Sequence, residues 1–150
     1  MSKELVLIRI EQEWKAFFDS FAGLTDNILM ESGAVGHWSI RDVLAHIATW
    51  EEEALKVLPL ILEGKPTPRY TRYGGIDAFN AQEQGRKQHL PLELVKDELV
   101  ATHQRLLKFL TEIPDSMFSS KSRFAKRLRL DTYNHYREHA HQINKWRADR

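Results

Sequence analysis

The sequence predicts an all-α protein, most simply a four-helix bundle, on three observations. Apolar residues recur at three-and-four spacing through several long segments, which is typical of amphipathic helices. No segment alternates polar and apolar residues for long enough to indicate a strand. The chain has 150 residues, of which 42% are hydrophobic and 29% charged. This is enough for one compact domain over residues 1–150 and leaves no room for a second.

Two helices are predicted in the first half of the chain. The first should end near Gly23, and its apolar stripe consists of Leu7, Ile10, Trp14, Phe17, Phe18 and Phe21. The stretch 31–39 is loop-like, and Ser39 followed by Asp42 resembles a capping box. We therefore expect a second helix to begin after Ser39 and to stop at Gly64, where prolines follow.

Two more helices are predicted in the second half. Asp77 is the expected N-cap of a third helix, which Pro91 interrupts or kinks before the amphipathic pattern continues towards Pro114. The last helix is expected from about Asp131 to Arg147, with Asp131 as its N-cap. Together these elements give the four helices of the predicted bundle.

The charge distribution argues against nucleic acid as a partner. Lys and Arg number 22 and Asp and Glu number 21, so the formal net charge is +1. The basic cluster Lys121–Arg129 is interpreted as a solvated loop in preference to a phosphate-contacting patch. The acidic run Glu51–Glu53 is likewise expected to be a solvated face.

The chain has no cysteine, which excludes disulfides, thiolate metal sites and a cysteine nucleophile. Any metal must therefore bind histidine, carboxylate or carbonyl groups. Glu11 and Glu13 come too early for a secretory signal, and no run approaches the ~20 apolar residues of a membrane helix. We expect a cytoplasmic protein with no membrane partner.

Histidine spacing is the main chemical signal. His135 and His139 are one turn apart, and helical geometry places them about 40° apart on the inward side of the last helix. His141 falls about 160° from His139 and should face solvent. Such a pair binds a metal ion or forms ordinary hydrogen bonds, and spacing alone favours the second. His46 flanks the apolar stripe of the second helix beside Trp50. Its spacing does not distinguish a metal ligand from a buried histidine that is hydrogen-bonded to a carbonyl.

Two segments carry a resemblance to a known family. GHWSIRDVLAHIATWEEEAL at 36–55 and YNHYREHAHQINKW at 133–146 resemble the second- and last-helix signatures of the DinB-like superfamily, and the FNA segment at 79–81 also fits. The nearest similarity is to its ClbS/DfsB-type branch, although His141 inside the last signature is a departure. The resemblance covers nearly the whole chain. It implies an up-down-down-up bundle of the DinB/YfiT type, in which His46, His135 and His139 hold one divalent ion.

The resemblance also implies a class of function. Three neutral imidazoles leave open positions on an ion, as in catalytic sites, and nitrogen ligands suit Zn or Ni without distinguishing them. Similar proteins suggest a metal-dependent enzyme acting on a small electrophile, a thiol transferase or hydrolase, with a low-molecular-weight thiol as possible cosubstrate. The alternative is a non-catalytic protein that sequesters a small molecule or toxin as stress or toxin protection. No residue is assigned a catalytic role.

A substrate pocket and a homodimer complete the expectations. Phe79, Asn80, Glu83 and Leu90 share a face of the third helix, and two of the four are polar. We expect Trp50, Asn80 and Glu83 to line a pocket for a small-molecule substrate, the alternative being a solvated rim of the bundle. Relatives often form homodimers, and the first helix, from LVLIRI to FFDSF, is apolar enough to serve two surfaces, the core and a dimer contact.

Overall fold

The computed structural model describes all of residues 1–150 and consists of helices and loops without a strand, so the predicted all-α class is confirmed. Its elements are α1 (Lys3–Ser20), α2 (Asp26–Leu29), α3 (Ile40–Leu62), η1 (Tyr70–Tyr73), α4 (Ile76–Lys87), α5 (Leu92–Thr111), η2 (Asp115–Phe118), α6 (Arg123–Asp131) and α7 (Tyr133–Ala148), where η marks a short 3-10 helix. The one β-type pairing is an isolated bridge between Val35 and Trp38. No helix is both long and apolar enough to cross a membrane.

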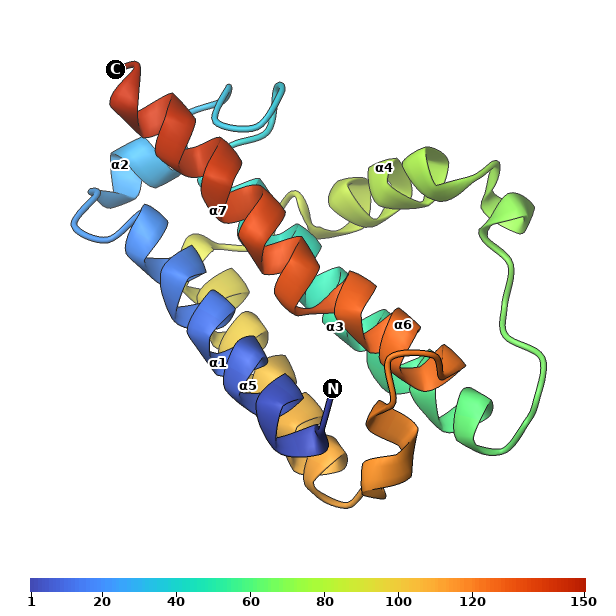
Figure 1. Ribbon diagram of the computed structural model, residues 1–150. Helices are drawn as coiled ribbons and strands as arrows, with labels where there is room; N and C mark the ends of the chain where they lie inside the picture. Colours follow the sequence, from blue (N-terminus) through green and yellow to red (C-terminus); the bar gives the residue numbers. More distant parts are fainter.

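The long helices form an up-down-down-up bundle (Figure 1). Helices α1 and α7 run in one direction and α3 and α5 in the other, while the crossover between α3 and α5 carries η1 and α4. Polar contacts at the helix ends agree with this arrangement. Lys3 Nζ donates to the carbonyl of Thr111 at 2.8 Å, joining the start of α1 to the end of α5. Arg147 Nη1 donates to the carbonyl of Ser20 at 3.2 Å, joining the ends of α7 and α1.

Helix α3 is the central element of the bundle. The predicted capping box is present, because Ser39 Oγ accepts from the Asp42 N–H and the Asp42 carboxylate accepts from the Ser39 N–H. The helix contacts α4, α5, α6 and α7 and is buried along most of its length. The prediction that Glu51–Glu53 forms a solvated face is wrong, because Glu51 and Glu53 point into these contacts and are buried.

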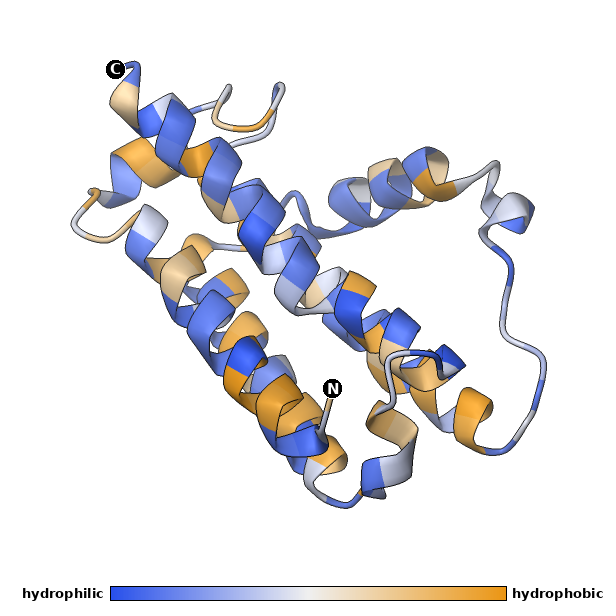
Figure 2. Ribbon diagram, viewed as in Figure 1, coloured by the Kyte–Doolittle hydropathy of each residue, from blue (hydrophilic) through white to orange (hydrophobic).

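Helix α7 is more polar than the other long helices of the bundle. Figure 2 shows its ribbon as mostly hydrophilic, whereas α1 and α5 carry long apolar stretches. Only five of its sixteen residues are buried, and His139 is one of them. The helix therefore brings polar groups to the bundle as well as packing against α1, where the Tyr136 ring lies 5.3 Å from that of Trp14.

The predicted last helix corresponds to α7, and a further helix, α6, precedes it where a loop was expected. Lys121–Arg129 is not a solvated loop, since α6 begins at Arg123. Its N-cap is Ser122, whose hydroxyl accepts from the Ala125 N–H at 2.9 Å. Phe124 and Leu128 are one turn apart and buried, so their burial holds this basic segment in a helix. Asp131 is consequently the buried last residue of α6 and not an N-cap, and the backbone turns at Thr132 before α7.

The predicted break in the third helix is confirmed. Helix α4 ends at Lys87 and α5 begins at Leu92, directly after Pro91. The N-cap of α4 is Gly75 and not Asp77, which lies in the first turn. The break sends α4 away from the bundle axis, so that it extends sideways from α3 (Figure 1). The space beside α3 is left for the site described next.

Candidate metal centre

Three histidines from two helices meet inside the bundle. His46 lies in the second turn of α3, and His135 and His139 lie one turn apart on α7. One ring nitrogen of each lies within 4.8 Å of the other two. His46 and His139 are each only 6% exposed. The tertiary fold thus brings together all three residues named from the sequence.

Hydrogen bonds among the three neutral rings cannot satisfy all of their facing nitrogens, so the cluster needs a cation. The Nε2 atoms of His46 and His135 are 3.0 Å apart, and those of His135 and His139 are 3.1 Å apart. A ring nitrogen offers either one N–H or one lone pair, in a single direction. His135 Nε2 can therefore satisfy one of its two neighbours but not both. No assignment of protons to three neutral rings makes both contacts hydrogen bonds.

Gln142 fixes the tautomer of one ring. Its side-chain oxygen lies 2.7 Å from His139 Nδ1, and because a carbonyl oxygen can only accept, Nδ1 carries the proton. In the neutral ring, the lone pair of His139 then lies on Nε2, directed at the other two histidines. An acceptor on the far nitrogen is the usual support of a metal-ligating histidine.

Electrostatics keep the rings neutral, which is the form that ligates metals. Burial, helped by His139 and Lys87, lowers the pKa of His46 to about 3. Burial also lowers the pKa of His135 well below its ordinary value and lowers that of His139. Three convergent lone pairs at neutral pH fit a divalent cation, so the residues present match the ion that the family resemblance implies.

An open cavity of about 440 Å³ adjoins the histidines. It is lined by Trp38, His46, Trp50, Tyr70, Ile76, Asn80, Arg127, Leu130, Asp131, His135, Glu138 and His139. Trp50 and Asn80, both expected from the sequence, meet here, and the indole N–H donates to the Asn80 side-chain oxygen at 2.9 Å. Glu83, also expected there, does not line the cavity and instead pairs with Arg86 at 2.9 Å.

Sequence reasoning missed a polar chain on the cavity wall. Arg127 Nε donates to the Asp131 carboxylate at 2.7 Å, and Arg127 Nη2 donates to the Tyr70 hydroxyl, also at 2.7 Å. The Tyr70 hydroxyl in turn donates to Glu53 at 3.0 Å. The available signal was the one-turn spacing of Arg127 and Asp131, in the same segment as the apolar pair Phe124 and Leu128.

Asp131 is the wall residue best suited to proton transfer. Burial raises its pKa to about 6, although the guanidinium of Arg127 opposes the shift. A carboxyl group with this pKa exchanges protons close to neutral pH, as a general acid or base must. Burial raises the pKa of Tyr70 to about 12, so its hydroxyl stays protonated.

A second polar cluster lies deeper in the bundle, formed by Trp14, Glu51, His103 and Tyr136. We call it the His103 cluster. His103 Nδ1 is 2.8 Å from a Glu51 oxygen and 3.4 Å from the Tyr136 hydroxyl, and the Trp14 ring stacks on the imidazole at 3.6 Å. Burial raises the pKa of Glu51, against the opposing effect of His103. His103 and Glu51 thus form an ordinary donor–acceptor pair, while the second carboxylate oxygen of Glu51 is buried without a partner.

Comparisons with known proteins agree with this architecture. The sequence profile of the DinB superfamily matches residues 9–143. An uncharacterised protein from Escherichia coli UTI89 superposes with a TM-score of 0.82 at 15% identity, covering 99% of this chain and 94% of that one. No curated protein matches the sequence.

Two further solved structures share the fold at 15% identity and a TM-score of 0.81. One is the colibactin self-resistance protein ClbS in complex with dsDNA, where the match covers 98% of this chain and 96% of that one. The other is described as Sibling Lethal Factor Precursor, DfsB, with 99% and 96% covered. The fold is therefore of the ClbS/DfsB type, as the sequence suggested.

Proposed function

This chain belongs to the DinB superfamily, and from that premise we propose that it binds one divalent metal ion through His46, His135 and His139 and uses it in catalysis. The substrate is a small electrophile, and the reaction is of the thiol transferase or hydrolase type. The observation that carries the proposal is the set of three Nε2 atoms whose contacts no neutral tautomers can satisfy. Nitrogen ligands make Zn and Ni the leading ions.

The surrounding residues support chemistry on a bound small molecule. A divalent ion with open positions supplies Lewis acidity and favours the ionised form of a thiol or water. Asp131, on the cavity wall, would take up the proton released by the thiol or water. It would return this proton to the oxygen of the substrate bond that breaks. Trp38, Trp50 and Tyr70 provide aromatic walls. Ile76 and Leu130, 54% and 63% exposed, give the cavity an apolar rim suited to an apolar substrate body.

The test begins with elemental analysis of untagged protein, which should contain one ion per chain. The His135→Ala variant should keep its helical circular dichroism and lose both the ion and the thiol-dependent opening of a model epoxide. In that reaction the sulfur–carbon bond forms as the ring carbon–oxygen bond breaks and the oxygen gains a proton. His141→Ala is the matched control, because His141 is an exposed histidine on the same helix. A metal-free native protein, or equal loss in both variants, would contradict the proposal.

A protective binding protein without catalysis is the second candidate. It is favoured by one comparison, since ClbS is described as a self-resistance protein. In this case the cavity beside the histidines sequesters a reactive compound. Cells producing His135→Ala would then remain protected against that compound, while the enzyme proposal requires that protection disappears together with the metal.

We propose that duplex DNA is not a partner of this chain, although ClbS was solved in complex with dsDNA. The support is the net charge of +1, because 21 Asp and Glu residues balance the 22 Lys and Arg residues. The electrophoretic mobility of a 30-base-pair duplex at low salt tests this. A shift that disappears steeply with added salt would show phosphate binding and contradict the proposal.

A homodimer through α1 is also proposed. Leu5 and Ile8 are 55% and 42% exposed on the outer side of this helix, while its apolar stripe packs inward. Two such faces would cover each other's apolar surface. Sedimentation velocity should show a dimer that Ile8→Lys converts to a monomer, whereas a native monomer at all concentrations would contradict this interface.

A further inference from the structure

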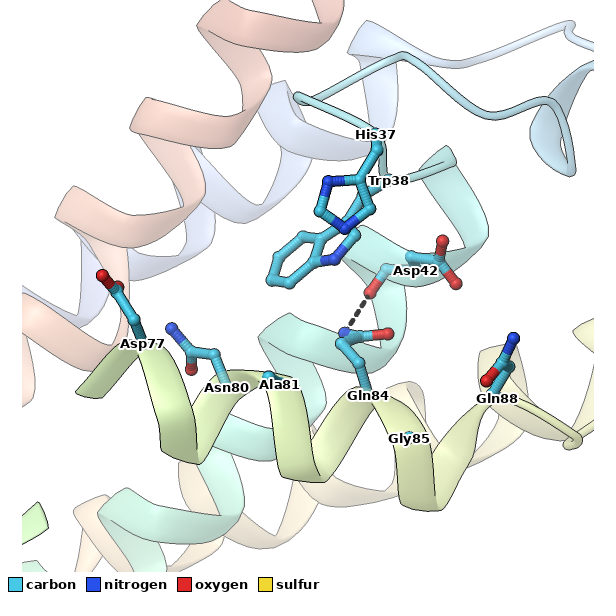
Figure 3. Close-up of a pocket in the computed structure, with 9 residues that line it drawn as sticks. All are labelled: His37, Trp38, Asp42, Asp77, Asn80, Ala81, Gln84, Gly85 and Gln88. Atoms are coloured by element: carbon cyan, nitrogen blue, oxygen red, sulfur yellow. Dashed lines mark hydrogen bonds between the residues drawn. The ribbon is translucent and has the colours of Figure 1, made fainter. Parts of the chain in front are cut away.

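We propose that the substrate site has a second compartment, which binds an uncharged, hydrogen-bonding tail of the compound whose reactive end lies at the histidines. This rests on the proposed function. The compartment, here called the amide groove, is a cavity of about 450 Å³ between α4 and the start of α3. It is lined by His37, Trp38, Asp42, Asp77, Asn80, Ala81, Gln84, Gly85 and Gln88 (Figure 3).

The amide groove adjoins the cavity at the histidines. Trp38 and Asn80 line both, so these two side chains stand at the boundary between them. The Trp38 ring also lies 4.8 Å from the ring of His46. A ligand that reaches past Trp38 and Asn80 would therefore occupy both spaces, with one end next to the proposed metal ligands.

Helix α4 presents one polar face to the groove. Figure 3 shows Asp77, Asn80, Gln84 and Gln88 directed from α4 towards the side of the groove that carries His37 and Trp38. Their spacing of three and four residues places them in a row along the helix. Three of the four are uncharged amides, each able to offer both a donor and an acceptor.

Gly85 keeps the floor of the groove open. A Cβ at this position would meet no atom within 4 Å, and the backbone there is not in a positive-φ conformation that would favour glycine. Glycine inside a helix costs about 0.5–1 kcal/mol relative to alanine. Neither local packing nor backbone geometry thus requires this glycine. Its effect is the absence of a side chain where the groove needs space.

Two amides are already oriented by the protein. Gln84 Nε2 donates to the Asp42 carbonyl at 2.9 Å, which leaves the Gln84 oxygen as a free acceptor. The Asn80 oxygen accepts from the Trp50 indole, which leaves the Asn80 NH₂ as a free donor. A fixed donor and a fixed acceptor, one turn apart, match a ligand amide or a hydroxyl pair, both of which carry the two complementary functions.

The charges on the groove disfavour an anionic tail. Its charged side chains are Asp42 and Asp77, and no lysine or arginine lines it. The Asp42 carboxylate is occupied by the Ser39 N–H and by Arg41 at 3.1 Å, so it is not free to bind a ligand donor strongly. A carboxylate tail would meet the charge of Asp77, which has no cationic partner, whereas a neutral amide or diol would not be repelled.

The test uses three thiols with the same cysteamine head and tails of similar length that end in an amide, a diol or a carboxylate. Thiolate binding is followed by the visible absorption of the cobalt-substituted protein. We expect the amide and diol probes to bind at least 10-fold more tightly than the carboxylate probe. Gly85→Leu, which fills the groove with a good helix former, should abolish this preference. Gln82→Leu adds the same side chain on another face of α4 and should leave it unchanged.

A second measurement separates failure of the groove from failure of the proposed function. N-acetylglycinamide, which has no thiol, should shift the side-chain amide NMR signals of Gln84 and Gln88 in metal-free protein, and Gly85→Leu should remove the shift. If cobalt does not bind, the proposed function fails while this measurement still tests the groove. Unshifted signals, or a tail preference that survives Gly85→Leu, would overturn the inference.

Discussion

The bundle contains two buried histidine clusters with opposite arrangements of protons and lone pairs. His46 and His139 in the metal centre and His103 in the other cluster are each 6% exposed. His103 Nδ1 lies 2.8 Å from a carboxylate oxygen of Glu51, so its N–H can donate to that oxygen. In the metal centre, the Nε2 atoms of His46 and His135 instead face each other at 3.0 Å. The degree of burial is therefore the same in both places, and the identity of the partners is what differs.

The comparison teaches that a buried histidine is a candidate ligand when its neighbours cannot complete its hydrogen bonds. Glu51 and Tyr136 make the His103 cluster a structural unit that joins α3, α5 and α7. The metal centre has no carboxylate among its three members, and a cation is the group that would satisfy all three lone pairs.

The largest predicted effect tests the structural role of the His103 cluster. Glu51→Ala should lower the free energy of unfolding by about 3–5 kcal/mol, because it leaves a buried imidazole without its partner. Metal content should stay at one ion per chain. Urea denaturation followed by circular dichroism measures the change. Glu11→Ala, at an exposed helical glutamate, is the control and should change the stability by no more than about 0.5 kcal/mol. A loss below about 1 kcal/mol for Glu51→Ala would mean that the His103 cluster does not stabilise the fold as proposed.

The next prediction compares histidines of equal burial. His46→Ala should weaken zinc binding by at least about 100-fold, since loss of a mere supporting hydrogen bond already costs 10–100-fold. His103→Ala should bind zinc as the native protein does and lose stability instead. Competition with a chromogenic chelator measures both affinities. Equal affinities in the two variants would remove the distinction between the clusters.

A smaller effect is expected from the support of the metal centre. Gln142→Leu removes the acceptor that places the proton of His139 on Nδ1. Zinc affinity should fall by about 10–100-fold with little change in the stability of the metal-free protein. Gln142→Glu retains an acceptor and should bind within about 10-fold of the native protein. An unchanged affinity in Gln142→Leu would show that this contact does not orient the ring.

The smallest predicted effect, counted per pH unit, is the dependence of stability on pH after a chelator has removed metal. The pKa of His46 is lowered from 6.5 to about 3 in the folded state, so the unfolded state binds more protons between these values. Above pH 6.5 the imidazole is neutral in both states and the free energy of unfolding is not reduced. As the pH falls from 6.5 towards 3, protonation of the unfolded state lowers the free energy of unfolding by up to about 1.4 kcal/mol per pH unit.

Glu51 should show the opposite sign. Its pKa is raised above 4.5 in the folded state, so its contribution is largest at low pH and decreases as the pH rises past 4.5. Urea titrations at pH 4.5, 5.5 and 6.5 should therefore give a shallower increase of stability with pH in His46→Ala than in the native protein, and a steeper one in Glu51→Gln. Parallel curves for all three proteins would contradict the assigned shifts.

Local patterns in the sequence were sufficient wherever a single helix decided the outcome. The capping box at Ser39, the break before α5 and the outward position of His141 follow from the geometry of one helix and its ends. The charged segment of α6 was misread because the burial of Phe124 and Leu128 depends on neighbouring elements. The same limit applied to Glu51, which is polar in sequence and fully buried in the bundle.

The sequence by itself determined the long helices, most of their polar and apolar faces and the shared face of His135 and His139, because rise and rotation per residue are constant along a helix. The tertiary structure alone decided which atoms meet between helices. In the folded chain, His46 lies next to His135, from which it is separated by 89 residues in the sequence. Arg127 and Asp131 line the cavity, and a Cβ at Gly85 would meet no atom within 4 Å. The relative position of two helices depends on the combined packing of many side chains, and no local spacing records it.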